Sequence, residues 1–259
     1  MTEILVTDFV KGLLIFLRII AVMFMAPVFS HNAVPNFAKM LLALALTYII
    51  YFTIPGDVNY NPQDGIVLLA FMGFKEVLTG LIMGFVLTFI FHAVNFGGML
   101  IGFDMGLSMA QAFDPNTEAE SNVIGQILVM FAIVIFILIN GHHYIVRGIT
   151  ASFKVIPLGF YTINESLFTL MTKYSASIFV VAVKIASPLM VSFFLVHLSA
   201  GIIARVIPSM NVFFVLFPLK LGLGFLLIIA SLPVIVYLLK SIMYSYENKL
   251  YDLIKVMSY

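Results

Sequence analysis

The chain has 259 residues, of which 63% are hydrophobic and 10% are charged. A soluble domain carries about 45–50% apolar and about 25% charged residues, so this composition excludes a soluble globular protein and predicts an integral membrane protein. The formal net charge is +1, and no basic stripe of the kind that neutralises phosphates is present, which excludes nucleic acid as a partner. The absence of Cys excludes disulfides and thiolate metal sites.

Apolar stretches predict an all-α chain with about six long helices. A helix needs about 20 apolar residues to cross about 30 Å of hydrocarbon, and six stretches reach or approach this length. In chain order they are residues 9–29, 40–54, 65–106, 123–140, 176–203 and 212–239. The third is too long for one simple span, so we expect it to bend, to extend out of the bilayer or to break near Gly97 and Gly98. Glu3 and Asp8 oppose the basic start of a cleavable signal peptide, so we expect the first stretch to be retained.

Three other segments are not predicted to span. Residues 104–122 form a polar loop with acidic but no basic side chains. Residues 142–175 are expected to lie at the membrane interface, with Asn164 as the N-cap of a helix that starts at Glu165. Residues 240–259 have the spacing of an amphipathic helix with a charged outer face. Lys and Arg are more frequent in the connections on the side that holds both termini, which predicts that both lie in the cytoplasm.

Charged side chains inside apolar stretches are candidates for function. They are Arg18, Lys75, Glu76, Lys184 and Lys220. Lys75 and Glu76 are adjacent, so on a helix they diverge by about 100°, and each needs a partner on another helix or subunit. Structural pairing or snorkelling is the favoured explanation, and a role in a proton relay or in permeation is the alternative.

Glycines spaced by four residues predict close helix packing. Gly80 and Gly84 form one such series, and Gly98, Gly102 and Gly106 form another. Small residues on one face let helix backbones approach each other closely. The second series leads into the loop at 106–121, where irregular backbone would be tolerated if it lines a cavity.

No pattern indicates catalysis, a metal or a cofactor. His142 and His143 are adjacent and have no nearby carboxylate cluster or H-E-x-x-H spacing. The sequence contains no G-x-S-x-G elbow and no phosphate-binding glycine loop. We therefore predict a non-enzymatic protein with no catalytic, cofactor-binding or metal-binding residues.

Five longer strings are more specific than hydropathy. They are RIIAVMFMAPVFSHNAVPNFAK, KEVLTGLIMGF, GGMLIGFDMGLSMAQAFDP, NGHHYIVRGITASFKVIPLG and GIIARVIPSMNVFFVLFPLK. These strings resemble, in order, the FliR family of flagellar biosynthesis proteins, whose injectisome relatives form the SctT group. The last string is close to the family's A-R-x-x-P-x-M-N-V-F-x-x-x-x-P-L-K signature.

The resemblance implies a single domain over residues 1–259 that acts without chemistry of its own. Its helical hairpins would pack with FliP-like and FliQ-like subunits into a conical export gate, in the bacterial inner membrane at the flagellar basal body. FlhB-like and FlhA-like export components, unfolded flagellar proteins and membrane lipid would be its other partners.

The same resemblance implies roles for individual residues. The loop at 106–121 would plug the closed gate, and its marked residues are Gly106, Met109, Phe113, Asp114 and Pro115. Gly98 and Gly102 would pack helices together. Charge pairing with neighbouring subunits would involve Arg18, Lys75, Glu76, Lys184, Arg205 and Lys220.

Other functions share part of this pattern. An injectisome export-gate subunit of the same family is the nearest alternative, although N-G-H-H and P-L-K favour the flagellar branch. A small-solute transporter or channel would share the hydropathy, the broken helices and the charges, but it should show repeated halves, and no convincing repeat is present. An intramembrane enzyme ranks last, because no paired nucleophile and base are visible.

Overall fold

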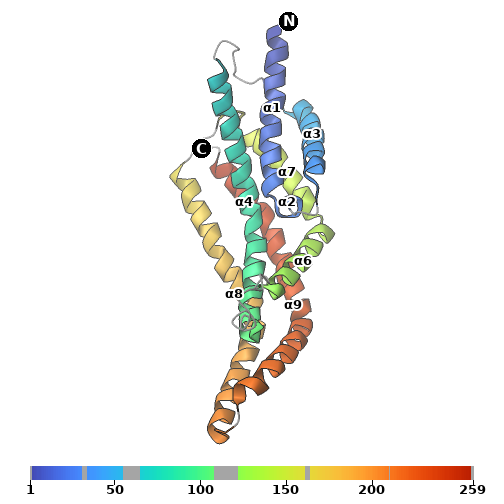
Figure 1. The fold of residues 1–259 in the computed structure, drawn as a ribbon. Helices are drawn as coiled ribbons and strands as arrows, with labels where there is room; N and C mark the ends of the chain where they lie inside the picture. The colour runs from blue at the N-terminus through green and yellow to red at the C-terminus, as the bar shows by residue number, and fades with distance from the viewer. Residues whose placement is uncertain are drawn as a thin grey trace. The chain divides into compact units, whose positions relative to one another are not determined.

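The structure, a computed structural model, describes residues 2–30, 34–54, 65–107, 122–160, 164–209 and 211–257. Every regular element in these residues is a helix, which confirms the all-α prediction (Figure 1). The helices are α1 (Thr2–Met25), α2 (Pro27–Ser30), α3 (Asn36–Thr53), α4 (Gly65–Met105), α6 (Val123–Leu138), α7 (Gly141–Val155), α8 (Glu165–Val206) and α9 (Val212–Val256).

The six predicted stretches correspond to α1, α3, α4, α6, α8 and α9. Among the described helices, α3, α4, α8 and α9 are long and apolar enough to cross a membrane, and the pair α6 and α7 would add a fifth if it is counted as one span. Helix α1 is not among them, and it carries Asp8, Lys11 and Arg18. Charged side chains in a helix raise the cost of placing it across hydrocarbon, which is why α1 does not qualify by composition.

Three helices are longer than a membrane is thick. Helix α4 has 41 residues, α8 has 42 and α9 has 45, and at 1.5 Å per residue each exceeds roughly 60 Å, about twice the hydrocarbon thickness. Helix α4 continues through Gly97 and Gly98, so the break considered at that point does not occur. The predicted amphipathic helix at 240–259 is not separate, because α9 continues through its start to Val256.

Short polar residues and glycine set the helix ends. Asn164 caps α8, as predicted, since its Oδ1 accepts from Leu167 N at 2.8 Å. Asn122 caps α6 in the same way, accepting from Gly125 N at 2.9 Å. Gly106 ends α4 with φ +86°, a left-handed conformation that a residue with a side chain adopts only with strain.

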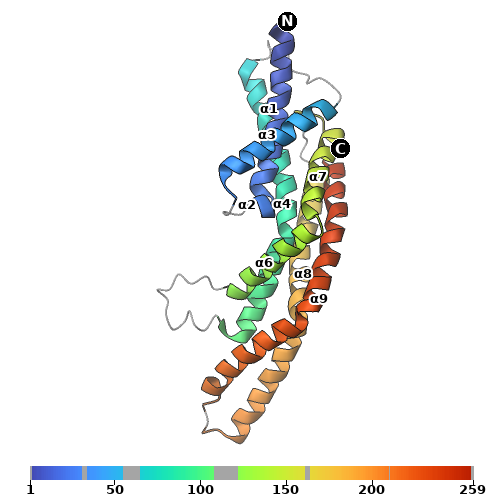
Figure 2. The ribbon, with the colours of Figure 1, turned by 90° about the vertical axis from the view of Figure 1, so that its right-hand side faces the viewer.

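The helices are divided between two compact units, and neither is continuous in sequence. The first contains residues 1–89, 140–174 and 244–259. In it α3 lies across α1 (Figure 2). Val10 and Leu14 of α1 and Met72 of α4 form a buried cluster, against which Leu69 and Leu158 pack. The single-domain interpretation stays a prediction.

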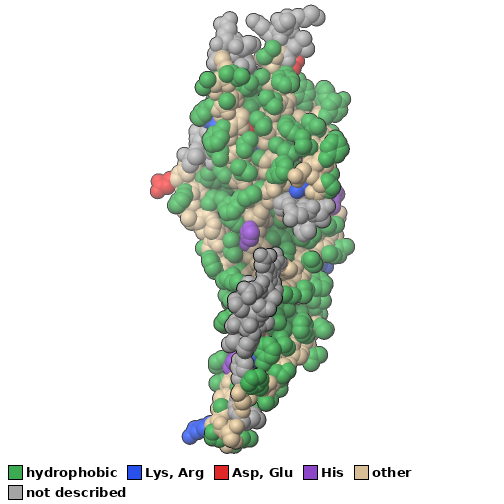
Figure 3. Space-filling view, in the orientation of Figure 1, with side chains coloured by type: hydrophobic (Ala, Val, Ile, Leu, Met, Phe, Trp, Pro, Cys, Tyr) green, Lys and Arg blue, Asp and Glu red, His purple; other side chains and the backbone are tan. Residues whose placement is uncertain are grey.

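The second unit contains residues 90–139 and 175–243. It holds the end of α4, all of α6, and an antiparallel hairpin made by most of α8 and α9. Much of its apolar surface is not covered by the chain: the most apolar 18-residue windows of α8 and α9 are only 28% and 11% buried. Figure 3 shows hydrophobic side chains over most of the described surface in that view. Lipid or other subunits must therefore cover these faces.

Candidate functional site

A buried ion pair joins α1 and α4 in the first unit. Arg18 Nε donates to Glu76 Oε2 at 2.6 Å, and Arg18 Nη2 donates to Glu76 Oε1 at 3.1 Å. The two side chains are 1% and 2% exposed. This two-point geometry matches the planar guanidinium to the carboxylate. Because an isolated charge is costly in an apolar core, each side chain makes the burial of the other tolerable.

The remaining donors of Arg18 point to α7 and the segment after it. Nη1 donates to Ser152 Oγ at 3.3 Å, and both Nη1 and Nη2 donate to the carbonyl oxygen of Ile156 at 3.3 Å. The guanidinium carbon lies 4.3 Å from the centre of the Phe153 ring, in a cation–π contact. Arg18 therefore links α1 to α7 through hydrogen bonds and a cation–π contact.

The carboxylate of Glu76 stabilises the turn that follows α7 by accepting a hydrogen bond from it. Gly159 N donates to Glu76 Oε1 at 2.7 Å. Gly159 has φ +77°, and a Cβ at this position would collide with Met72. Only glycine satisfies both the left-handed backbone and the space beside Met72. The ion pair and this turn thus form one closed network.

The sequence predicts that Arg18 and Glu76 pair with neighbouring subunits, but in the structure they pair with each other. Their separation of 58 residues along the chain explains why local spacing gives no sign of the contact. Glu76 was expected to need a partner on another helix or another subunit, and Arg18 of α1 is that partner.

The other predicted charges have different surroundings. Lys75 Nζ lies 4.8 Å from the centre of the Phe71 ring. Lys184 and Arg205 are exposed. Lys220 Nζ lies 2.6 Å from His197 Nε2. Pairing of these four cations with neighbouring subunits stays a prediction.

The first glycine series brings α4 close to α1. A Cβ on Gly80 would collide with the carbonyl oxygen of Arg18 and would lie 2.7 Å from Ala21 Cβ. At Gly84 a Cβ would lie 2.5 Å from Met25 Cβ. Both distances are below ordinary contact, so both positions need glycine. The close approach also holds the backbone of Arg18 against the helix that carries Glu76.

Gly98 and Gly102 of the second series differ in how closely they approach α6. In the second unit a Cβ on Gly98 would collide with the backbone of Gly125 on α6, lying 2.6 Å from its nitrogen. At Gly102 the nearest atoms would be 3.8 Å away, which is ordinary contact. Gly98 therefore marks a point where two helix backbones touch, and Gly102 does not.

Two asparagine side chains stabilise the contact between α4 and α6 near Gly98. Asn122 Nδ2 donates to both the backbone oxygen and Oδ1 of Asn95, at 2.9 and 2.8 Å, while its Oδ1 caps α6 through Gly125. Sequence analysis missed Asn95, Gly125 and Ser152. The position of Asn122 directly before an apolar run was the one available signal, because it is typical of an N-cap.

The predicted plug is described only at its start. Gly106 ends α4, its nitrogen donates to Phe103 O at 3.0 Å, and a Cβ on it would lie 3.5 Å from the Phe217 ring. The other predicted plug residues lie outside the described residues: Met109, Phe113, Asp114 and Pro115. The plug therefore stays a prediction.

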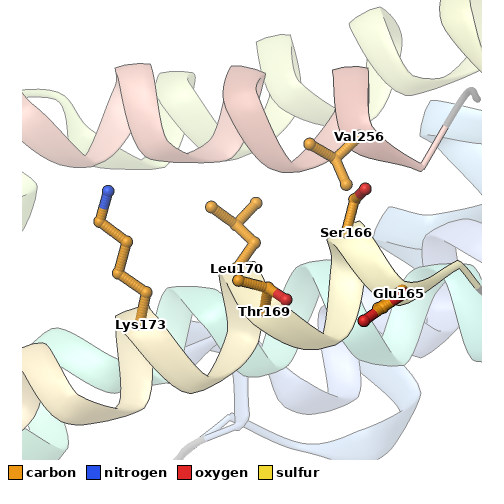
Figure 4. A pocket seen from close by; sticks show the side chains of 6 residues that line it. All are labelled: Glu165, Ser166, Thr169, Leu170, Lys173 and Val256. Carbon is orange, nitrogen blue, oxygen red and sulfur yellow. The ribbon is translucent and has the colours of Figure 1, made fainter.

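Two further features of the described residues are a pair of adjacent histidines and an open groove. The described part of the chain contains no group of three His, Asp or Glu side chains able to hold a metal ion. The rings of His142 and His143 lie against each other, 4.3 Å between centres. An open groove of about 430 Å³ is lined by Glu165, Ser166, Thr169, Leu170 and Lys173 of α8 and by Val256 of α9. Figure 4 shows Glu165 and Lys173 at opposite ends of this groove, so its two charged groups do not converge.

Long apolar helices, closely packed glycines and an internally satisfied charge network define a helical, membrane-embedded protein. The chain belongs to the family of bacterial export proteins, family 1, whose model matches residues 9–246. This match confirms the family that the five sequence strings indicated.

Relatives specify the branch of the family. The chain is 34% identical over 233 residues to the flagellar biosynthetic protein FliR of Bacillus subtilis strain 168, which covers 89% of both chains. It is 31% identical over 238 residues to the protein of the same name from Escherichia coli K12, covering 92% of this chain and 90% of the relative. For the Aquifex aeolicus protein of that name the identity is 29% over 249 residues, covering 95% and 92%. These matches favour the flagellar branch over the injectisome and transporter alternatives.

Proposed function

We propose that the chain is a non-catalytic subunit of the bacterial flagellar type III protein-export gate. It helps to form, and to plug, the channel through which unfolded flagellar proteins cross the inner membrane. The observation that carries this proposal is the family match over residues 9–246, together with relatives that are named flagellar biosynthetic protein FliR and cover about nine tenths of the chain.

Exposed apolar surface supports a role inside a larger assembly. Helices α8 and α9 present large side chains such as Phe194, Leu198, Leu226 and Ile229 that are at least half exposed. FliP-like and FliQ-like gate subunits are the proposed neighbours on these faces. FlhB-like and FlhA-like components are the proposed contacts beyond the gate, and lipid covers what protein does not.

A structural rather than chemical role is consistent with how the buried polar groups are used. Arg18 and Glu76 bond to each other and to the segment after α7, which leaves neither poised to act on a substrate. Catalytic groups need access to a reacting atom, and this network offers none. We therefore propose that the protein shapes a passage and that other components supply the energy.

The test is recovery of the assembly. The full chain, co-expressed with the neighbouring genes of its operon, is captured in mild detergent, and the surviving complex is weighed by native mass spectrometry. The expected result is a discrete mixed complex with two other small hydrophobic proteins. A monomer or a homo-oligomer without partners would overturn the export-gate proposal and favour a small-solute transporter.

A further inference from the structure

The open groove in the first unit has opposite charges at its two ends. Glu165 lies at one end and Lys173 at the other, both on α8 and both exposed (Figure 4). They are separated by a little more than two helical turns, so their Cα atoms lie roughly 12 Å apart along the helix axis. A ligand that contacts both charges must therefore carry a negative group near Lys173 and a positive group near Glu165.

The middle of the groove is lined by hydroxyl groups and apolar side chains. Ser166 and Thr169 carry the hydroxyl groups, and Leu170 of α8 and Val256 of α9 provide apolar surface. A hydroxyl group both donates and accepts, so it can bond to an anion or to an ammonium group. The groove volume of about 430 Å³ lies in the range of about 300–1,000 Å³ that small-molecule sites occupy. The groove therefore suits a small zwitterion.

The groove lies where both of its helices change from polar to apolar sequence. Along α8, Lys173 comes shortly before the apolar stretch at 176–203, and Glu165 lies farther from that stretch. Along α9, Val256 belongs to the charged stretch that follows the apolar residues 212–239. A change of this kind is typical of the headgroup level of a bilayer. Along the helix, the Lys173 end is therefore nearer the hydrocarbon than the Glu165 end.

An ethanolamine phospholipid carries its charges in the matching order. Its phosphate comes directly after the acyl chains and the glycerol, and its primary ammonium group is terminal. A phosphate beside Lys173 and an ammonium beside Glu165 would each meet the opposite charge. A glycerol headgroup offers Glu165 no cation. A choline headgroup cannot donate hydrogen bonds and is usually held by aromatic rings, and none of the six lining side chains is aromatic.

We propose that the groove between the start of α8 and the end of α9 binds the headgroup of a phospholipid that carries a primary ammonium group. The phosphate accepts hydrogen bonds from Lys173 Nζ and Thr169 Oγ1, and the ammonium donates to the carboxylate of Glu165 and to Ser166 Oγ. The start of an acyl chain packs on Leu170. This inference requires only that the chain is embedded in a membrane, so it goes beyond the export-gate proposal and does not rest on it.

Competition between headgroups tests the identity of the ligand. The full chain, with any subunits that it retains, is captured in mild detergent and mixed with equal amounts of phosphatidylethanolamine, phosphatidylglycerol and phosphatidylcholine that have the same acyl chains. Native mass spectrometry then measures which lipid stays bound. The expected result is one retained phosphatidylethanolamine for each copy of the chain. Its preference over the other two lipids should be about tenfold, since a hydrogen bond to a charged group contributes about 1.5–3 kcal/mol.

Matched variants assign each end of the groove to its part of the headgroup. Lys173→Met removes the partner of the phosphate and should reduce retained phosphatidylethanolamine by about tenfold. Glu165→Gln keeps the size of the side chain but removes its charge. It should abolish the preference for phosphatidylethanolamine over phosphatidylglycerol while total retained lipid changes less, an effect that a merely structural role would not produce. Lys154→Met is the control, because it removes an exposed lysine of α7 that does not line the groove.

Three outcomes would overturn the lipid site. Equal retention of the three lipids by the unchanged chain would show that the groove does not select a headgroup. A preference for phosphatidylethanolamine that survives both Lys173→Met and Glu165→Gln would place the lipid elsewhere on the chain. Loss of the lipid when partner subunits are present would show that protein fills the groove. The export-gate proposal is judged separately, by whether partner subunits appear in the same spectra.

Discussion

Arg18 and Glu76 face each other from α1 and α4 through two hydrogen bonds of 2.6 and 3.1 Å, and both are almost completely buried. Gly159 N adds a third bond to the carboxylate. The pair therefore holds together two helices and the turn after α7. Its charges are satisfied within one chain, so the first unit does not need another subunit to neutralise them.

Glu76→Ala is expected to destabilise the first unit strongly. Removal of the carboxylate leaves the Arg18 guanidinium buried without a counter-charge and frees the Gly159 amide, and breaking a buried pair costs about 3–5 kcal/mol. We expect less chain in the membrane, weaker recovery of the assembly and a lower midpoint of thermal unfolding in mild detergent. Secretion per assembled complex should change less than the amount of complex.

The double variant Arg18→Met with Glu76→Leu is the matched control. It removes both charges at similar volume, so it should be clearly more stable than Glu76→Ala alone. If the single variant assembles normally while secretion fails, the pair has a role in transport rather than in folding. Equal loss in the single and double variants would show that packing, not charge, governs the site.

Sequence periodicity located the long helices because their signal is local. Apolar runs and the Asn164 cap each depend on residues close together in the chain, and the structure agrees with them. Partners distant in sequence were not predictable in this way. The ion pair of Arg18 links positions 58 residues apart, and Asn122 reaches back 27 residues to Asn95.

The glycine spacing indicated close helix packing, but it could not show which of the glycines lies against the neighbouring helix. Gly98 and Gly102 share one helix face and the same four-residue interval. Only the position of α6 distinguishes them, because Gly125 comes against Gly98. A single sequence contains no information on which residue of a small face meets the partner backbone.

Gly98→Ala and Gly102→Ala are therefore expected to differ. An added methyl group at Gly98 forces α4 and α6 apart, and overpacking of this kind costs about 1–3 kcal/mol. At Gly102 the methyl group has room, and alanine favours a helix over glycine by up to about 1 kcal/mol. Thermal unfolding of the two purified variants, followed by circular dichroism, should give a lower midpoint for the first and an equal or higher midpoint for the second. Equal shifts would mean that the helices do not cross at Gly98.

Asn122 combines two roles that substitutions can separate. Asn122→Ala removes the cap on Gly125 and both bonds to Asn95, so a loss of about 1–2 kcal/mol is expected. Asn122→Ser keeps a capping oxygen but is too short to bridge to Asn95, and it should fall between alanine and the native residue. Chemical denaturation in detergent provides the measurement. If serine is no better than alanine, the cap contributes nothing and the bridge to Asn95 accounts for the effect.

The loop at 106–121 is expected to seal the closed gate. Because Gly106 ends α4 with a left-handed backbone and Asn122 caps α6, the helices on both sides have their own end signals and do not depend on the loop sequence. Replacement of residues 107–121 by a glycine–serine linker of equal length keeps both end signals and the connection, so it should leave assembly largely intact while the closed gate leaks ions, since it lacks Met109, Phe113 and Pro115. Deletion of residues 106–121 should leak as well, but it removes Gly106 and draws Asn122 away from Asn95, so it is also expected to lower the amount of assembled complex. The measurement is the ion conductance of membranes that hold equal amounts of each complex. If both variants conduct no more than the native complex, the loop is not a plug, and only the gate-forming part of the proposed function remains.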